Sequence, residues 1–330
     1  MKTHYIIPIF IPEKACPHRC IYCNQFNITD KTQVTDYNYV TQTIETYLQT
    51  IPKEATKRIA FFGGTFTGMS MEEQNLYLER AYPYITRGEI DEIQLSTRPD
   101  YINREILENL KHYGVRTIEL GTQSLNDEVL RFSGRGHTVQ DVEKSSELIK
   151  KHHFKLGLQM MIGLPLDTKQ RAIETAQKIV EFGADCTRIY PTLVIKNTFL
   201  EKLYLEGKYQ PLSMGNAIDQ TLAIMDIFEK SHVSILRIGL HPSQSLIEGT
   251  ELVAGPFHVS FKELVLSEKW RRKLQPYIGN LSHKECVIRV PQSEINAAVG
   301  YGGRNKKWLQ QYFPTVRFIP TTDEFEVLFS

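Results

Sequence analysis

Residues 5–23 read Tyr-Ile-Ile-Pro-Ile-Phe-Ile-Pro-Glu-Lys-Ala-Cys-Pro-His-Arg-Cys-Ile-Tyr-Cys, an apolar run of strand length that leads into three cysteines. These cysteines, Cys16, Cys20 and Cys23, are separated by three and then two residues. The chain has five cysteines, an odd number, and three of them fall within eight residues, which is unlike a disulfide framework. The clustering instead predicts a metal centre directly after the first strand.

Two kinds of metal centre fit these thiols. Three thiolates at this spacing can wrap one corner of a cuboidal iron–sulfur cluster and leave one iron without a protein ligand. A zinc site needs four ligands, usually in two separated pairs, and the nearby fourth candidate, His18, lies inside the same short loop. The spacing therefore favours the cluster over zinc.

The first strand opens a series in which strand-like and helix-like segments alternate. Short apolar runs predict seven strands, at residues 5–11, 58–62, 92–96, 117–120, 155–161, 186–193 and 233–240. Amphipathic stretches predict helices at residues 36–49, 70–81, 103–113, 139–152, 168–182 and 214–231. Ser70 and Thr138 carry the signature of helix-capping residues. The alternation predicts an α/β fold, a partial (β/α) TIM-type barrel, with its chemistry at the carboxyl ends of the strands.

The composition is that of an ordinary globular protein, and 330 residues are enough for about two domains. Hydrophobic residues make up 41% and charged residues 23% of the chain, which argues against disordered, collagen-like and membrane-spanning classes. The longest apolar stretch, near residues 156–166, is far shorter than the roughly 18 residues that span a bilayer. The N-terminus lacks the cleavage site of a signal peptide, so we expect a cytoplasmic protein.

Charge is divided unevenly along the chain. Residues 271–330 hold nine Lys and Arg against five Asp and Glu, a net charge of +4, which leaves −3 for the remainder of a chain with +1 in total. A basic end on a mildly acidic body suits an enzyme that carries a nucleic-acid-binding handle. A solvated basic surface accounts for the same charge equally well.

The cysteine loop resembles the signature of the radical S-adenosylmethionine (SAM) superfamily, Cys-x3-Cys-x2-Cys, with the aromatic Tyr22 before the last cysteine. The resemblance implies a 4Fe–4S cluster held by Cys16, Cys20 and Cys23. It also implies that the open iron binds the amino and carboxylate groups of SAM, with Tyr22 along the adenine. An electron from the cluster would then cleave the sulfonium bond and release a 5′-deoxyadenosyl radical.

Glycines and polar residues at the ends of the next strands agree with this resemblance. The residues expected to contact SAM there are Gly63, Gly64, Thr65, Thr97, Arg98 and Gln123. The first three lie in a Phe-Phe-Gly-Gly-Thr-Phe run that resembles the superfamily's glycine motif, which binds the methionyl amino group. A plain strand-to-helix turn accounts for the same run.

A narrower resemblance covers about residues 5–245. Segments that resemble the radical domain of the Elongator catalytic subunit, which modifies the wobble uridine of transfer RNA, are residues 96–101, 118–124, 135–138, 189–198 and 205–209. Two features depart from that family. The Elongator loop has a longer gap between its first two cysteines, and the 85 residues after residue 245 have no room for the Elongator acetyltransferase domain. This argues against carboxymethylation of uridine from acetyl-CoA.

The C-terminal residues carry a second pattern. Residues 285–330 read as strand, helix, helix, strand and strand, with a Gly-x-x-Gly turn and a basic run at the second helix. This order resembles a KH RNA-binding domain, although the final helix of the usual layout is missing. A helix C-cap accounts for a lone Gly-x-x-Gly. The residues expected to contact RNA are Gly300, Tyr301, Gly302, Gly303, Arg304, Lys306 and Lys307.

These patterns predict three parts: a radical SAM partial barrel at residues 1–245, a connector at residues 246–284 and a KH-like domain at residues 285–330. The connector is expected to lack a clear strand–helix unit and to cover the barrel mouth. The predicted function is modification of transfer or ribosomal RNA through a 5′-deoxyadenosyl radical. The expected partners are RNA and an electron donor such as ferredoxin or flavodoxin, with no membrane and no DNA.

Two other functions stay open. One is a radical SAM enzyme that acts on a small molecule, as the oxygen-independent coproporphyrinogen oxidases do, and the other is a non-catalytic iron–sulfur RNA-binding protein. His241 and His258 are further candidates for substrate contacts, although a lone histidine is more often structural. Cys186 and Cys286 lie in predicted strands and are expected to be ordinary buried cysteines.

Overall fold

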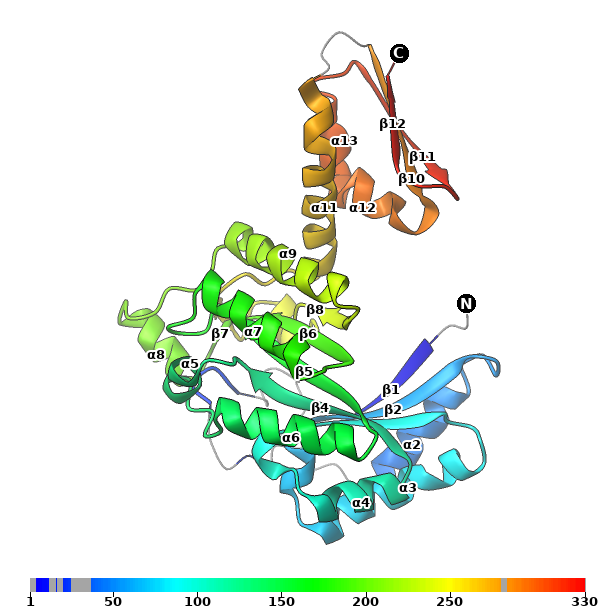
Figure 1. Ribbon diagram of the computed structural model, residues 1–330, viewed down its shortest axis with the longest axis vertical. Helices are drawn as coiled ribbons and strands as arrows, with labels where there is room; N and C mark the ends of the chain where they lie inside the picture. The colour runs from blue at the N-terminus through cyan, green and yellow to red at the C-terminus, as the bar shows by residue number, and fades with distance from the viewer. Residues whose placement is uncertain (1–3, 12–15, 17–19, 25–36, 280–283, 330) are drawn as a thin grey trace.

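The main body of the protein is one sheet of seven parallel strands. The computed structural model describes residues 4–11, 16, 20–24, 37–279 and 284–329. The spatial order is β1-β2-β3-β4-β5-β6-β8, and every neighbouring pair is parallel. The strands are β1 (His4–Ile11), β2 (Thr56–Gly63), β3 (Glu92–Thr97), β4 (Val115–Gln123), β5 (Lys155–Ile162), β6 (Cys186–Pro191) and β8 (Ser234–Ile238). The sheet curls into an open half-barrel (Figure 1), which confirms the predicted fold class.

Most of the helices that connect the strands cover the convex face of the sheet (Figure 1). The helices of the main body are α2 (Tyr37–Leu48), α3 (Met71–Thr86), α4 (Arg104–His112), α5 (Asp127–Phe132), α6 (Val139–Lys151), α7 (Lys169–Glu181), α8 (Phe199–Leu205) and α9 (Met214–Lys230). Of these, α5 and α8 pack beside the cysteine loop instead. Short 3-10 turns lie at η1 (Phe66–Gly68) and η2 (Pro99–Tyr101). Ser70 and Thr138 form complete capping boxes at the starts of α3 and α6, as predicted, so that sequence signals define both helix starts.

The two faces of the sheet differ in chemistry. On the convex face, alternate strand residues such as Ile59, Ile93 and Leu156 are fully buried against the helices. The opposite alternation places polar side chains inside the barrel. There Glu119 of β4 and Arg188 of β6 form a buried bidentate ion pair, with N–O distances of 2.5 and 2.9 Å. The main apolar core therefore lies on the convex face of the sheet, and the barrel interior holds charged side chains.

The segment after β8 contains a long helix that was not predicted. Short elements α10 (Gln244–Ile247) and β9 (Leu252–Ala254) come first, and β9 pairs with β7 (Val194–Ile195). Helix α11 (Phe261–Leu274) follows. The expectation that the connector lacks a clear strand–helix unit is wrong, since β9 is followed by α11. The sequence pattern does not indicate this helix, because its buried residues serve two cores in turn and do not form one continuous apolar stripe. Phe261, Leu264 and Val265 pack into the barrel core, whereas Trp270 and Leu274 pack into the C-terminal core.

The C-terminal unit is a small sheet with helices on it, carried at the far end of α11 (Figure 1). Its elements are β10 (Glu285–Pro291), α12 (Ile295–Val299), α13 (Arg304–Leu309), β11 (Thr315–Thr321) and β12 (Glu326–Phe329), with 3-10 turns η3 (Gln275–Gly279), η4 (Gln292–Glu294) and η5 (Tyr301–Gly303). The sheet order is β11-β10-β12, with β10 parallel to β11 and antiparallel to β12. The predicted order of strand, helix, helix, strand and strand is therefore present. In this unit α11 supplies the third helix that residues 285–330 lack.

Across the described part of the chain, no helix combines the length and the apolar character needed to cross a membrane.

Candidate active site

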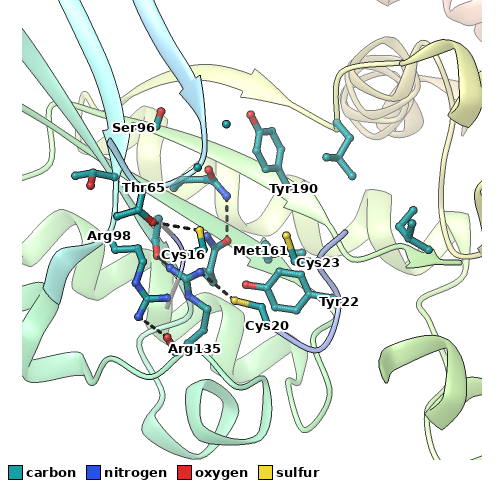
Figure 2. A pocket seen from close by; sticks show the side chains of 18 of the residues that line it. Cys16, Cys20, Tyr22, Cys23, Thr65, Ser96, Arg98, Arg135, Met161 and Tyr190 are labelled. Carbon is teal, nitrogen blue, oxygen red and sulfur yellow. Dashed lines mark hydrogen bonds between the residues drawn. The ribbon is translucent and has the colours of Figure 1, made fainter. Parts of the chain in front are cut away.

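One pocket lies at the carboxyl ends of the barrel strands, with a volume of about 260 Å³. Six strand ends contribute to its wall, through Phe10, Gly63, Thr97, Gln123, Met161 and Tyr190. The three clustered cysteines complete the wall from the loop after β1 (Figure 2). The location is the one where α/β barrels place their chemistry.

The cysteine thiols make specific contacts with the pocket wall. Cys16 Sγ lies 3.3 Å from Thr65 Oγ1. Cys20 is buried, and its Sγ accepts a hydrogen bond from Arg135 Nη1 at 3.3 Å (Figure 2). The backbone N–H of Ile21 donates to the carbonyl of Ser133 at 3.1 Å, which fixes the loop against the segment that carries Arg135.

Three free thiols of this pocket suit the thiolate ligands of a multinuclear cluster. All five cysteines are free, and three of them line this pocket. Within the described ranges, no group of three or more His, Cys, Asp and Glu side chains is arranged to hold one metal ion. A cuboidal cluster does not need such convergence, because each thiolate binds a different iron. His18, the fourth ligand of the zinc alternative, lies outside the described residues.

The other two cysteines are ordinary core residues, as predicted. Cys186 is buried in β6 and Cys286 in β10. Burial raises the pKa of the Cys186 thiol to about 12 and that of Cys286 to about 11, so both stay protonated at neutral pH.

The glycine motif at the end of β2 is packed against β1. Gly63 has φ +112°, and a Cβ at this position would collide with the carbonyl oxygen of Ile11. The same carbonyl accepts a hydrogen bond from the N–H of Gly64 at 3.4 Å. Gly63, Gly64 and Thr65 all line the pocket. Packing against β1 is therefore sufficient to explain why residue 63 is a glycine, independently of any ligand in the pocket.

The residues predicted at the ends of β3 and β4 line the same pocket. Thr97 Oγ1 lies 2.6 Å from Thr67 Oγ1. Arg98 makes a bidentate ion pair with Asp100, at 2.9 and 2.8 Å. Gln123 accepts a hydrogen bond from Gln159 Nε2 at 2.9 Å, and its backbone lies in the left-handed region at φ +65°. A non-glycine residue in that region is strained, and such strain is concentrated at functional sites.

Tyr22 and Arg135 both line the pocket and interact electrostatically. Burial raises the pKa of Tyr22 well above its usual range, and the nearby Arg135 guanidinium only partly opposes this, so the phenol is neutral. Arg135 is 7% exposed, and its Nη2 donates to the carbonyl of Gly121 at 2.5 Å while its own carbonyl accepts from Arg98 Nη2 at 2.6 Å. Arg135 falls in the Elongator-like segment 135–138 but is not among the site residues expected from the sequence. The signal was an arginine between two glycines, which on its own predicts only a turn.

The two candidate histidines lie elsewhere. Neither His241 nor His258 is among the described residues that line the site pocket. His241 is exposed, with Nδ1 3.1 Å from Arg237 Nη2. His258 lines a separate small pocket, and its ring contacts the ring of Tyr301 in the C-terminal unit.

The predicted RNA-contacting residues are contiguous on the C-terminal unit. The turn joins α12 to α13, and Arg304, Lys306 and Lys307 are exposed on α13. Gly300 is closely packed, since a Cβ there would lie 2.8 Å from the Arg304 side chain. The structure places these residues on one turn and helix, apart from the site pocket.

Comparison with known proteins supplies the family. The model of the radical SAM superfamily matches residues 11–179, about half of the chain, and that of the radical SAM C-terminal domain matches residues 184–271. The chain is 28% identical to the tRNA uridine(34) acetyltransferase of Methanocaldococcus jannaschii over 255 residues, which are 65% of this chain and 47% of that protein. It is 27% identical to Elongator complex protein 3 of Bos taurus over 265 residues, which are 67% and 48% of the two chains.

A solved structure shares the fold. The archaeal Methanocaldococcus infernus Elp3, with an N-terminal deletion, superposes with a TM-score of 0.64 at 22% identity, over 83% of this chain and 64% of that chain. The chain spans about half the length of the curated relatives it matches. The cofactors of the matched family are a 4Fe–4S cluster and SAM, and three cysteines beside a glycine-lined pocket fit them. The chain belongs to the radical SAM superfamily.

Proposed function

We propose that this protein is a radical SAM enzyme that modifies RNA, either transfer RNA or ribosomal RNA. The observation that carries the proposal is the convergence of Cys16, Cys20 and Cys23 on one pocket at the carboxyl ends of the barrel strands. Two of these thiols already contact polar groups of the wall, at Thr65 and Arg135.

The residues of the pocket divide between two ligands. Cys16, Cys20 and Cys23 would hold a 4Fe–4S cluster, which when bound supplies the electron for reductive cleavage of SAM. The residues proposed around SAM are Tyr22, Gly63, Gly64, Thr65, Thr97, Arg98 and Gln123. Tyr22 is a neutral, half-buried ring and suits an adenine. The hydrogen bonds of Gln123 and Arg98 hold these side chains in place before a ligand arrives, which reduces the ordering cost of binding.

RNA as substrate rests on two supports. Relatives that match most of the barrel are named for transfer RNA uridine modification. The C-terminal unit adds a Gly-x-x-Gly turn in which Tyr301 and Gly302 are exposed, with three exposed basic residues beside it, and basic groups near such a turn suit phosphates. We keep the division into a barrel at residues 1–245, a connector at residues 246–284 and a KH-like domain at residues 285–330 as part of this proposal.

The enzyme would also need an external reductant, because each turnover of SAM cleavage consumes one electron. A ferredoxin or flavodoxin is the proposed donor. Cys16 and Cys23 are only half-buried in the pocket wall, which suits electron entry over a short distance.

Mass spectrometry of RNA nucleosides tests the substrate. RNA from cells that lack this protein is incubated anaerobically with the reduced enzyme and SAM, and is then digested to nucleosides. We expect one nucleoside to change mass with the wild-type protein and not with Cys20→Ala. An unchanged nucleoside profile, together with steady formation of 5′-deoxyadenosine, would reject RNA and point to a small-molecule substrate.

A further inference from the structure

We propose that Tyr301 and His258 form an aromatic platform that guides a single-stranded RNA segment from the Gly-x-x-Gly turn to the mouth of the site pocket. The inference rests on the proposed function and adds the form of RNA and the path that it takes. It also gives a role to His258, which lies outside the site pocket and contacts Tyr301 of the turn.

The turn is open on its outer side. Gly302 and Gly303 have φ of +62° and +74°, and no described heavy atom lies within 4 Å of the position where a Cβ would stand on either residue. The packing of the protein therefore does not require two small residues there. Gly302 is exposed and Gly303 is partly exposed, so a sugar-phosphate backbone can approach the turn closely on this side.

The turn is also held rigidly on α11. The N–H of Tyr301 donates to Ser267 Oγ at 2.8 Å, and Asn305 Nδ2 donates to the carbonyl of Ser267 at 2.8 Å. Ser267 and Asn305 are each 1% exposed. Because the first half of α11 packs into the barrel core, these bonds fix the position of the turn relative to the site pocket.

The rings of Tyr301 and His258 meet at the inner side of the turn. Their centroids are 5.2 Å apart at 90°, an edge-to-face contact, and Tyr301 is 44% exposed. His258 Nδ1 accepts a hydrogen bond from the N–H of Ser260 at 3.0 Å, which fixes the orientation of its ring. An exposed ring braced by a second ring provides a surface on which a base can stack.

The platform adjoins the wall of the site pocket. His258 lines a small pocket together with Leu193 and Leu240, and both leucines also line the site pocket. A strand whose phosphates lie on the turn can therefore place its next bases on Tyr301 and then past the half-buried Leu240 toward the site pocket, beneath which Leu193 is buried. Base stacking needs exposed base faces, which a duplex does not offer, so the geometry selects single-stranded RNA.

Binding of a labelled single-stranded oligouridylate to the full-length protein tests this platform. We expect Tyr301→Ala to weaken binding roughly ten- to a hundredfold, the effect of losing one stacked base. Tyr301→Phe keeps the ring and should bind as the wild type does, and His258→Gln should weaken binding less than Tyr301→Ala. Tyr47→Ala is the matched control, because Tyr47 is a similarly exposed tyrosine on the barrel, at 37%. Circular dichroism of each variant verifies that it is folded.

The outcomes separate the platform from the proposed function. If Tyr301→Ala binds the oligouridylate as tightly as the wild type does, the platform is wrong. The proposed RNA-modifying function would not be affected by that result. Equal losses in Tyr301→Phe and Tyr301→Ala would also overturn it, because the ring would not be the contact. Equal affinity for the oligouridylate and for its duplex with oligoadenylate would refute selection of a single strand. No binding by a wild-type protein that forms 5′-deoxyadenosine would reject the RNA substrate itself, and the platform with it.

Discussion

The glycines of the barrel and those of the C-terminal unit are used in opposite ways. At Gly63 a side chain is forbidden because the Ile11 carbonyl of the neighbouring strand occupies the space. At Gly302 the space is empty to 4 Å among the described atoms, and only the backbone angle favours glycine. Packing within the fold explains Gly63. At Gly302 the absence of a side chain leaves space on the surface that a binding partner can occupy.

Ion pairs of the two regions show the same contrast. Arg188 and Glu119 inside the barrel have side chains that are 10% and 4% exposed. Arg289 and Glu326, which pair across β10 and β12, are 52% and 49% exposed. The Glu119–Arg188 pair is therefore part of the barrel interior, whereas the Arg289–Glu326 pair of the C-terminal unit is accessible to solvent.

The largest expected effect is on iron content, which should differ between a cysteine variant of the barrel and one of the C-terminal unit. The reconstituted wild-type protein should bind about four irons per chain, and Cys20→Ala should bind none, because three thiolates hold the cluster. Cys286→Ala, in the C-terminal unit, should keep all of the iron, since burial leaves that thiol protonated. Iron and sulfide analysis after anaerobic reconstitution measures this. Iron retained by Cys20→Ala, or lost from Cys286→Ala, would contradict the assignment of the ligands.

A smaller effect is expected when one member of each ion pair is removed. Arg188→Met leaves the Glu119 charge buried without a partner and should lower the free energy of unfolding by about 3–5 kcal/mol. Arg289→Met removes an exposed pair and should cost about 1 kcal/mol or less. Urea denaturation of both variants gives the two values. Equal losses would show that the barrel interior does not exclude water from its charges.

Alanine at the two glycines sharpens the contrast further. Gly63→Ala combines a strained backbone with a collision against Ile11 and should destabilise the fold by about 3 kcal/mol. Gly302→Ala meets only the backbone strain and should cost about 1 kcal/mol. Thermal or urea unfolding compares them. A larger loss of unfolding free energy in Gly302→Ala than in Gly63→Ala would contradict this account, because Gly302 would then be the glycine that packing requires.

The smallest effect concerns the exposed charges of α13. Lys306→Ala and Lys307→Ala should each lower the slope of log affinity for oligouridylate against log salt by somewhat under one unit, because one fewer phosphate is neutralised. Lys53→Ala, a barrel lysine exposed to solvent, serves as the control and should leave the slope unchanged. Slopes that do not differ between these variants would place the phosphates elsewhere.

Much of the barrel could be predicted from sequence, because each of its signals is local. Strand-length apolar runs recur with helical stretches between them, and the cysteine spacing is compact enough to indicate a metal centre by itself. Capping residues at Ser70 and Thr138 define helix starts within four residues of chain. Agreement between these local patterns and the global fold made the fold class predictable.

Features that depend on distant residues could not be predicted. Helix α11 has apolar residues for two different cores, so its pattern does not indicate one buried face. Arg135 reaches Cys20 across 115 positions of sequence, and the ring contact between His258 and Tyr301 joins two units of the fold. The pairing of Glu119 with Arg188 depends on strand register, which determines the residues that face the barrel interior.

Formation of 5′-deoxyadenosine from SAM tests most directly whether the barrel pocket is a radical-generating site. The reduced wild-type protein, with cluster and SAM but no substrate, should form it slowly. Cys20→Ala should form none, and Gly64→Val should keep its iron but form little, because a side chain at Gly64 would obstruct the ligand on the pocket wall. A wild-type protein with full iron content that forms no 5′-deoxyadenosine, or a Cys20→Ala variant that forms as much as the wild type, would contradict the proposed chemistry of this pocket.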